Sequence, residues 1–312
     1  MSSPAETSTE GSPSADASAE SVPASGTNSD GGVRRSGNSF FGDAWVNFKR
    51  WNVKAVRNPF VLVVSLAQPI IFLLLFTEVF GGIAGDAINR GGSPGIGYET
   101  FLVPAIAIQV SLAAAVTSGI GLVNDIENGM FEKVLVTPMN RTAVFAGKTG
   151  AEVLRIVIQV GIILGLGVLL GARIATGIVG AMGIALVGLL FSLWFISISN
   201  TIAVITRDQE STIIAANLVQ FPLLFLSSAF LPLDELPGWI QTVARFNPVT
   251  YGVDAARALM LDRDVMTVIE VTRFEGLWNT LVPGIGVLVA LDLVFGAIAV
   301  YMLSGATSSD VE

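Results

Sequence analysis

Six stretches of this 312-residue sequence are apolar for about as long as a helix needs to cross a lipid bilayer. The hydrocarbon core is about 30 Å thick, and a helix of about 20 residues spans it. The six stretches cover approximately residues 59–80, 101–123, 151–171, 177–205, 211–231 and 281–303. Inside lipid, backbone groups must find hydrogen-bond partners within their own segment, which favours helices. We therefore predict an all-α polytopic membrane protein with a six-span domain over residues 59–303.

Charge and side-chain content limit the chemistry that the chain can perform. Only 13% of its residues are charged, against about 25% in an ordinary soluble domain. The chain has no cysteine and no histidine, which excludes disulfides, thiolate chemistry and histidine-based proton transfer. Its carboxylates, lysines and hydroxyls form no catalytic pattern in the sequence. We predict no catalytic residues, no metal site and no cofactor bound by this chain.

One short motif, Gly147-Lys148-Thr149, matches the end of the nucleotide-binding P-loop. The complete motif, G-x-x-x-x-G-K-[ST], cradles phosphates with backbone N–H groups and needs a glycine five residues before Gly147. Thr142 occupies that position, so the loop lacks the residue that makes its positive-φ turn. We predict that the chain itself is no ATPase.

Basic residues near the ends of the apolar runs predict the orientation, because cytoplasmic loops carry an excess of Lys and Arg. The side that includes the N-terminus holds Arg34, Arg35, Lys49, Arg50, Lys54, Arg57, Lys133, Arg141, Lys148 and Arg207; the other holds Arg90, Arg173, Arg245, Arg257, Arg263 and Arg273. With six spans, both termini lie on one side. We expect a protein of the plasma membrane with cytoplasmic N- and C-termini.

The chain ends differ from the apolar domain. Residues 1–38 are rich in Ser, Ala, Pro and Gly, and the first 32 contain five acids and no base; such a segment cannot bury enough apolar surface to fold, so we expect a disordered acidic tail. Residues 39–58 place aromatic side chains at helical spacing among cations, which predicts an amphipathic helix in the membrane interface. Residues 304–312 form a short cytoplasmic tail. The amphipathic helix either anchors the chain or docks a partner.

Two further motifs lie between the apolar runs. The loop after the second run contains Glu127, Gly129, Glu132, Leu135, Thr137, Pro138, Arg141 and Lys148 in the pattern of an acid, a glycine, E-K-x-L-x-T-P-x-x-R and a later lysine. The segment before the last run contains Asn247, Pro248, Tyr251, Asp254 and Arg257 in the pattern N-P-x-x-Y-x-x-x-x-x-R. Over about residues 40–303, these motifs and their order resemble the ABC-2 type permeases, the membrane subunits of exporters related to daunorubicin-resistance and polysaccharide-export permeases.

The resemblance implies the partners and the site. The first loop would be the coupling element that contacts a separate ATP-binding subunit, which holds ATP and Mg²⁺. We expect a short helix there, ended by Pro138, with Glu127 near its positive N-terminal end; the alternative is a solvated turn. The second motif would form re-entrant helices before the last span, with Asp254 and Arg257 as an exposed pair that contributes at most about 1 kcal/mol. A second copy of the chain or a homologous permease and the lipid membrane complete the expected partners, with no nucleic acid.

Polar residues inside the apolar runs are the candidates for a translocation path. They are Gln68, Gln109, Gln220, Asn217 and Asp292. Interhelical hydrogen bonds are an equal explanation for the amides. Asp292 is costly at that depth, and it is either a structural group or an ion site. The function implied by the resemblance is efflux of a drug-, lipid- or glycan-like substrate; the alternatives are an ion-coupled secondary transporter that uses Asp292 and a membrane scaffold that transports nothing.

Overall fold

The computed structural model describes residues 40–57, 59–90, 96–129, 141–268 and 273–306. The chain divides into residues 1–36 and 37–312, and every described residue lies in the second unit. Its elements are α1 (Phe40–Arg57), α2 (Pro59–Arg90), α3 (Tyr98–Glu127), α5 (Arg141–Leu169), α6 (Gly177–Thr206), α7 (Gln209–Phe225), the 3-10 helix η1 (Leu233–Glu235), α8 (Gly238–Ala244), α9 (Pro248–Leu261) and α10 (Trp278–Ala306). The described residues are helical with no strand, which confirms the predicted all-α class.

Five described helices are long and apolar enough to cross a membrane, where the sequence predicts six. They cover Leu62–Asp86, Tyr98–Glu127, Gly147–Leu169, Gly177–Thr206 and Trp278–Ala299. The fifth predicted span, residues 211–231, corresponds to α7, which has 17 residues and ends at Phe225 instead of continuing to Leu231. Pro222 lies inside α7, and the polar Ser227-Ser228 pair follows the end of the helix within the predicted apolar run. At 17 residues, α7 is at the lower limit for a spanning helix.

Two helices extend well beyond the apolar runs that predicted them. The structure continues α2 to Arg90 through Gly81, Gly82 and Gly85, ten residues beyond the predicted end. It starts α5 at Arg141, ten residues before the predicted span. Apolar sequence shows how much of a helix lies in lipid, while capping and breaking residues decide where the helix ends. The predicted boundaries of these two helices were therefore wrong, although their existence was right.

The helix α3 forms the centre of the unit. It packs against α2, α5, α6, α7 and α9, and 78% of its most apolar 18-residue window is buried, against 17% for the windows of α2 and α10. An aromatic group on α6 (Phe191, Trp194 and Phe195) continues this core with edge-on ring contacts. The α2 and α10 windows remain exposed, as expected of helices that face lipid.

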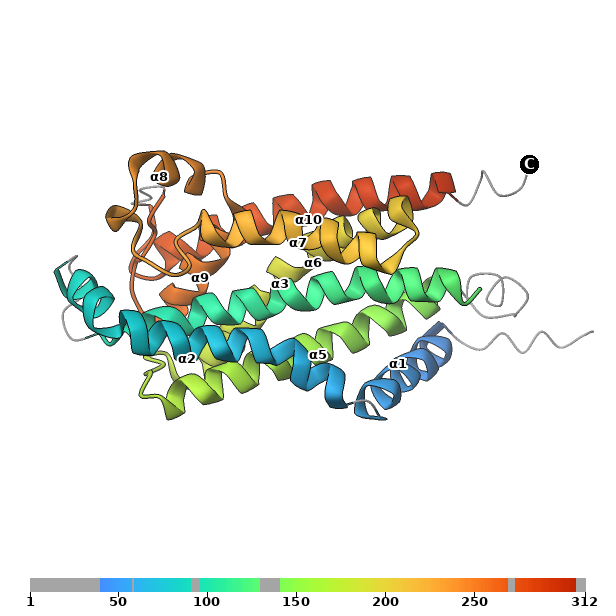
Figure 1. Ribbon diagram of the computed structural model, residues 1–312, viewed down its shortest axis with the longest axis horizontal. Coiled ribbons are helices and arrows are strands. Elements are labelled where there is room, and N and C mark those ends of the chain that lie inside the picture. Colours follow the sequence, from blue (N-terminus) through green and yellow to red (C-terminus); the bar gives the residue numbers. More distant parts are fainter. Residues whose placement is uncertain (1–39, 58, 91–95, 130–140, 269–272, 307–312) are drawn as a thin grey trace, which may run out of the picture. The chain divides into compact units, whose positions relative to one another are not determined.

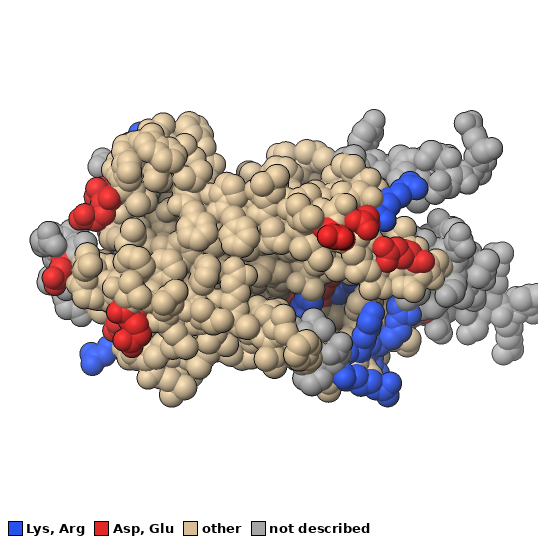
Figure 2. Space-filling model, viewed as in Figure 1, with Lys and Arg blue, Asp and Glu red and all other residues tan. Residues whose placement is uncertain are grey.

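The long helices run side by side, so their connections gather at two ends (Figure 1). We call them the α1 end, with α1, the end of α3, the start of α5 and the α6–α7 turn, and the α9 end, with α8, α9 and the start of α10. Figure 2 shows that the charged side chains on this face lie toward these two ends and leave a broad uncharged middle. Such a band is typical of a surface that contacts the hydrocarbon core.

Candidate functional site

The predicted break at Asn247-Pro248 separates α8 from α9. The Asn247 side chain caps α9 by accepting the Val249 N–H at 2.9 Å, and Pro248 occupies the first turn, where its missing N–H costs nothing. The Asn247 amide also donates to the carbonyls of Leu223 and Leu226, at 2.6 and 2.8 Å. Asn247 therefore joins the end of α7 to the start of α9. Tyr251 extends this junction by donating to the Arg245 carbonyl at 2.7 Å.

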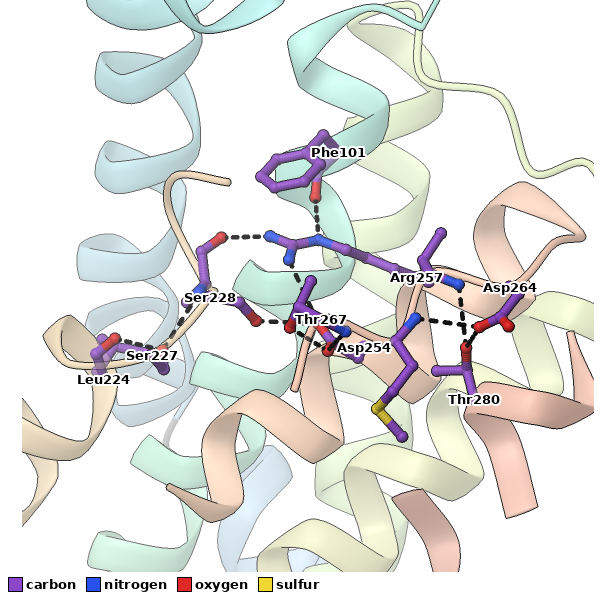
Figure 3. Close-up of polar contacts among 12 residues, drawn as sticks. Phe101, Leu224, Ser227, Ser228, Asp254, Arg257, Asp264, Thr267 and Thr280 are labelled. Carbon is purple, nitrogen blue, oxygen red and sulfur yellow. Dashed lines mark hydrogen bonds and ion pairs between the residues drawn. The ribbon is translucent and has the colours of Figure 1, made fainter. Parts of the chain in front are cut away.

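Arg257 is buried at the α9 end, with only 2% of its surface exposed. Its Nε donates to the Phe101 carbonyl at 3.1 Å, and its Nη2 donates to the Ala229 carbonyl at 2.7 Å. The guanidinium carbon lies 3.5 Å from the centroid of the Phe101 ring. Burial lowers the pKa of Arg257 to about 10, with the nearby Asp254 opposing this shift, so the group is charged at neutral pH. Arg257 thus connects α9 with α3 and with the segment that follows α7 (Figure 3).

Asp254 is the acidic partner of this arginine, and it is fully buried. Its Oδ1 lies 3.7 Å from Arg257 Nη1 and accepts the Ser228 hydroxyl at 2.9 Å. Its Oδ2 accepts the backbone N–H and the hydroxyl of Thr267, at 3.0 and 2.6 Å. The prediction that this pair is exposed was therefore wrong. The reason is that α9 packs against α3, α6 and α10, which enclose the face that carries both residues.

Two neighbouring contacts complete this hub, which we define as Asp254, Arg257, the groups bonded to them, and the Tyr98–Phe230 and Thr280–Asp264 contacts. The Tyr98 hydroxyl donates to the Phe230 carbonyl at 2.8 Å. Thr280, on α10, donates to Asp264 at 2.7 Å and accepts the Val265 N–H at 3.0 Å (Figure 3). These bonds satisfy irregular backbone that would otherwise be buried without partners. The hub therefore holds the connections of the α9 end against the long helices.

The coupling motif lies at the opposite end, and only part of it is described. Glu132, Leu135, Thr137 and Pro138 fall outside the described residues, and the side chain of Arg141, the first residue of α5, is not described either. Glu127 is the last residue of α3, so placing it at the N-terminal end of a separate short helix was wrong. Its carboxylate accepts the Gln209 amide of α7 at 2.8 Å.

Gly129 has a local role that its residue type explains. It follows the last turn of α3 with φ of +62°, and its N–H donates to the Ile126 carbonyl at 3.0 Å. Glycine adopts this left-handed conformation at little cost and commonly ends helices in this way. Gly129 therefore fixes the point at which the chain leaves α3 for the coupling segment.

Gly147 and Lys148 lie inside α5, where backbone N–H groups serve the helix. A Cβ on Gly147 would lie 2.7 Å from Asn47 Cβ and 2.9 Å from the Phe48 nitrogen, so this glycine allows α1 to approach closely. Lys148 is 9% exposed, and its Nζ lies 5.5 Å from the centroid of the Trp51 ring of α1. The glycine and lysine of the P-loop-like motif therefore hold α1 against α5.

The structure brings together two of the five predicted path residues. Gln68 of α2 and Asn217 of α7 line an open groove of about 720 Å³, whose other walls are Ile213, Ile214, Leu218, Phe221 and Pro222. Gln109 and Gln220 are buried within the helices instead, with 1% and 3% exposure. Asp292 is half-buried on α10 and does not line this groove.

Comparison with known proteins matches residues 43–261 to the family described as the ABC-2 type transporter. The chain belongs to this family. It is 32% identical over 202 residues to the daunorubicin resistance ABC transporter permease protein DrrB1 of Streptomyces coeruleorubidus, covering 65% of this chain and 69% of that one. It is 23% identical over 218 residues to the probable doxorubicin resistance permease protein DrrC of Mycobacterium tuberculosis, covering 70% and 75%. Nodulation protein J of Rhizobium leguminosarum is 27% identical over 230 residues, covering 71% and 81%.

The ABC-2 match covers α1 from Asp43 onward, both motif regions and α9, and it ends at Leu261, the last residue of α9. The predicted resemblance is therefore confirmed. The hub also contains residues that the sequence did not single out, namely Tyr98, Phe101, Ser228 and Thr267. Their partners are distant in the chain, up to 156 residues for Phe101 and Arg257. For the contact between Ser228 and Asp254, the local signal in the sequence was the polar Ser227-Ser228 pair at the end of an apolar run.

Proposed function

We propose that this chain is the membrane permease subunit of an ABC exporter and that a separate ATP-binding subunit, which holds ATP and Mg²⁺, drives it through the coupling segment at residues 127–141. The observation that carries this proposal is the continuity of α3. This helix ends at Glu127 beside the coupling segment, and near its other end the Phe101 carbonyl binds Arg257 of the hub. A 30-residue helix is about 45 Å long. A displacement at the coupling segment would thus reach the hub through one rigid element.

A second permease copy would cover the α2–α7 face. The described part of α7 exposes Ile214 and Leu218 by 61% and 73%, and α2 exposes Val63 and Ile71 by 60% and 58%. These side chains adjoin the groove that Gln68 and Asn217 line. Apolar walls with a few amides suit an amphipathic substrate. In this arrangement both termini are cytoplasmic, and the α9 end faces the outside of the plasma membrane.

Amphipathic drugs are the substrate class that we propose. Two relatives carry daunorubicin or doxorubicin resistance in their names, and the groove offers apolar surface with two amide groups. The test uses inside-out vesicles that contain the chain and the proposed ATP-binding subunit. We expect ATP-dependent uptake of a fluorescent anthracycline, and no uptake when the P-loop lysine of the partner is replaced.

Alanine at both Gln68 and Asn217 should lower this uptake while basal ATP hydrolysis continues. Gln241→Ala, at the α9 end and away from the groove, is the matched control and should leave uptake unchanged. Uptake that is equal in the double variant and the parent would exclude this groove as the path.

The ion-coupled alternative depends on Asp292. Its Oδ1 is buried and has no hydrogen-bond partner among the described residues, which is the feature that an ion site would need. If Asp292 drives transport, uptake should continue without ATP and stop when an ionophore removes the ion gradients. Uptake that needs ATP and tolerates the ionophore supports the exporter. The reverse result refutes it.

A further inference from the structure

The helix α1 exposes an unusual combination of side chains. Phe41, Trp45 and Val56 are 81%, 64% and 79% exposed, and Lys49 and Arg57 are exposed among them. Contiguous apolar surface of this kind usually marks an interaction site. Because aromatic rings and cations occur together on it, the surface suits the headgroup layer of a bilayer.

The side of α1 that faces α5 has the opposite character. Asp43 and Asn47 are 1% and 4% exposed, and Asn47 lies against Gly147 of α5. In a water-soluble amphipathic helix the polar residues face outward and the apolar residues are buried. In α1, polar residues are buried and rings are exposed, so its surroundings are not purely aqueous.

The exposed side of α1 carries an excess of positive charge. Trp45, Val46, Lys49, Arg50, Val53, Lys54 and Arg57 line a shallow groove of about 820 Å³. Among the described residues, no carboxylate forms an ion pair with Lys49, Lys54 or Arg57. Asp125 of α3 lies within electrostatic reach of Lys54. Because this one acid faces several cations of the groove, the groove keeps a net positive charge.

The position of α1 in the chain determines what can cover this groove. The helix ends at Arg57, α2 begins at Pro59, and the membrane span of α2 begins at Leu62. The groove is thus only a few residues from the hydrocarbon core. A lipid headgroup is the negatively charged partner that is always present at that depth.

We propose that this groove is a binding site for an anionic phospholipid of the bilayer. The lipid phosphate lies among Lys49, Lys54 and Arg57, which line the same groove, and its glycerol and upper acyl chains contact Trp45 and Val46. This site is separate from the groove that Gln68 and Asn217 line, and it does not depend on the proposed transport function.

Trp45 reports on occupancy directly. The full chain is placed in vesicles, and quenching by brominated phosphatidylglycerol is compared with quenching by brominated phosphatidylcholine. The Trp45 signal is the difference between the parent and Trp45→Phe. We expect a preference for phosphatidylglycerol of about fivefold for each contributing cation at low salt, which high salt reduces. The triple variant Lys49→Gln, Lys54→Gln and Arg57→Gln, which keeps Arg50, should remove most of this preference.

A charge-matched control replaces Arg173, Arg245 and Arg273, which are exposed in segments next to α9 and before α10, and should keep the parent's preference. Unchanged quenching by brominated phosphatidylcholine in the first triple variant would show that α1 still lies at the bilayer. A triple variant that keeps the parent's preference overturns the proposal. A preference that emerges only after deletion of residues 1–36 also overturns it, because the acidic tail would then be the occupant of the groove.

Discussion

The two ends of the helices use positive charge in opposite ways. At the α9 end, Arg257 is buried, and its guanidinium contacts Asp254, two carbonyls and an aromatic ring. At the α1 end, Lys49 and Arg57 are exposed on one side of a helix whose other side is held by a glycine contact. Removing one partner of a buried charge strongly destabilises the fold, because the charge stays buried without compensation. An exposed charge is solvated by water, so its partners add little stability.

This contrast assigns different tasks to the two ends. The hub fixes the irregular connections of the α9 end through side chains that are distant in sequence. The α1 end remains open to partners, because its cations and the end of α3 lie at the surface. Substitutions at the hub should therefore change stability, and substitutions at the α1 end should change association.

The largest effect is expected for Arg257→Ala. It leaves Asp254 as a buried charge without its cation and leaves the Phe101 and Ala229 carbonyls without this donor. Loss of one member of a buried ion pair costs about 3–5 kcal/mol. Thermal unfolding of the purified chain in detergent measures the loss. Arg245→Ala, at the exposed end of α8, should change stability by less than about 0.5 kcal/mol. Equal effects of the two substitutions would contradict the contrast between buried and exposed charge.

Gly147→Leu should destabilise the other end, by about 1–3 kcal/mol, through overpacking. The new side chain would push α1 away from α5 at Asn47 and Phe48. Faster amide hydrogen exchange over residues 40–57, with unchanged exchange in α9, is the expected result. Gly161→Leu is the matched control, because its Cβ meets nothing within 4 Å. If both leucines leave exchange in α1 unchanged, the close contact between the helices does not hold α1.

Asn247→Ala tests the junction between α7 and α9. It removes the cap of α9 and the donor to the Leu223 and Leu226 carbonyls, so we expect a loss of about 1–2 kcal/mol. Unfolding in detergent measures this loss. Asn217→Ala is the comparison, because the Asn217 amide donates only to the Ile213 carbonyl of its own helix in the described structure. An equal loss in the two variants would show that the cap adds nothing.

Local sequence predicted the elements of this fold well and their contacts poorly. Apolar runs identified the five long helices, and Asn247-Pro248 identified the break before α9, because hydropathy and capping are properties of neighbouring residues. The burial of Asp254 was not predictable in this way. Ser228 and Thr267, which are 26 and 13 residues from Asp254 in the chain, reach it only after α9 has packed.

The α1 end shows the same limit for a motif. Gly147-Lys148-Thr149 matches the end of a phosphate-binding loop in sequence. In the structure, Gly147 instead allows α1 to pack closely against α5 at Asn47. Likewise, acids before a Thr-Pro pair predicted a helix that begins near Glu127, whereas α3 ends there. The sequence predicted a coupling segment here but did not show which helix its flanking residues belong to.

Glu127→Lys should have the smallest effect on stability and a specific effect on association. The residue is exposed, so losing its bond to Gln209 costs little. A cation at the C-terminal end of α3 is favoured by the helix dipole by a few tenths of a kcal/mol, which offsets that loss. The variant should insert and unfold like the parent. It should nevertheless lose co-purification with the ATP-binding subunit or stimulation of ATP hydrolysis, because the charge presented to that partner is reversed.

Glu275→Lys makes the same charge reversal at an exposed residue of the α9 end and is the control. It should leave both association and ATP hydrolysis intact. The two variants are best compared in one membrane preparation, so that differences in expression cancel. If Glu127→Lys assembles and stimulates hydrolysis like the parent, the end of α3 does not contact the partner through this residue. The exposed cations of α1 would then bind the membrane, and this end of the chain would have no other partner through Glu127.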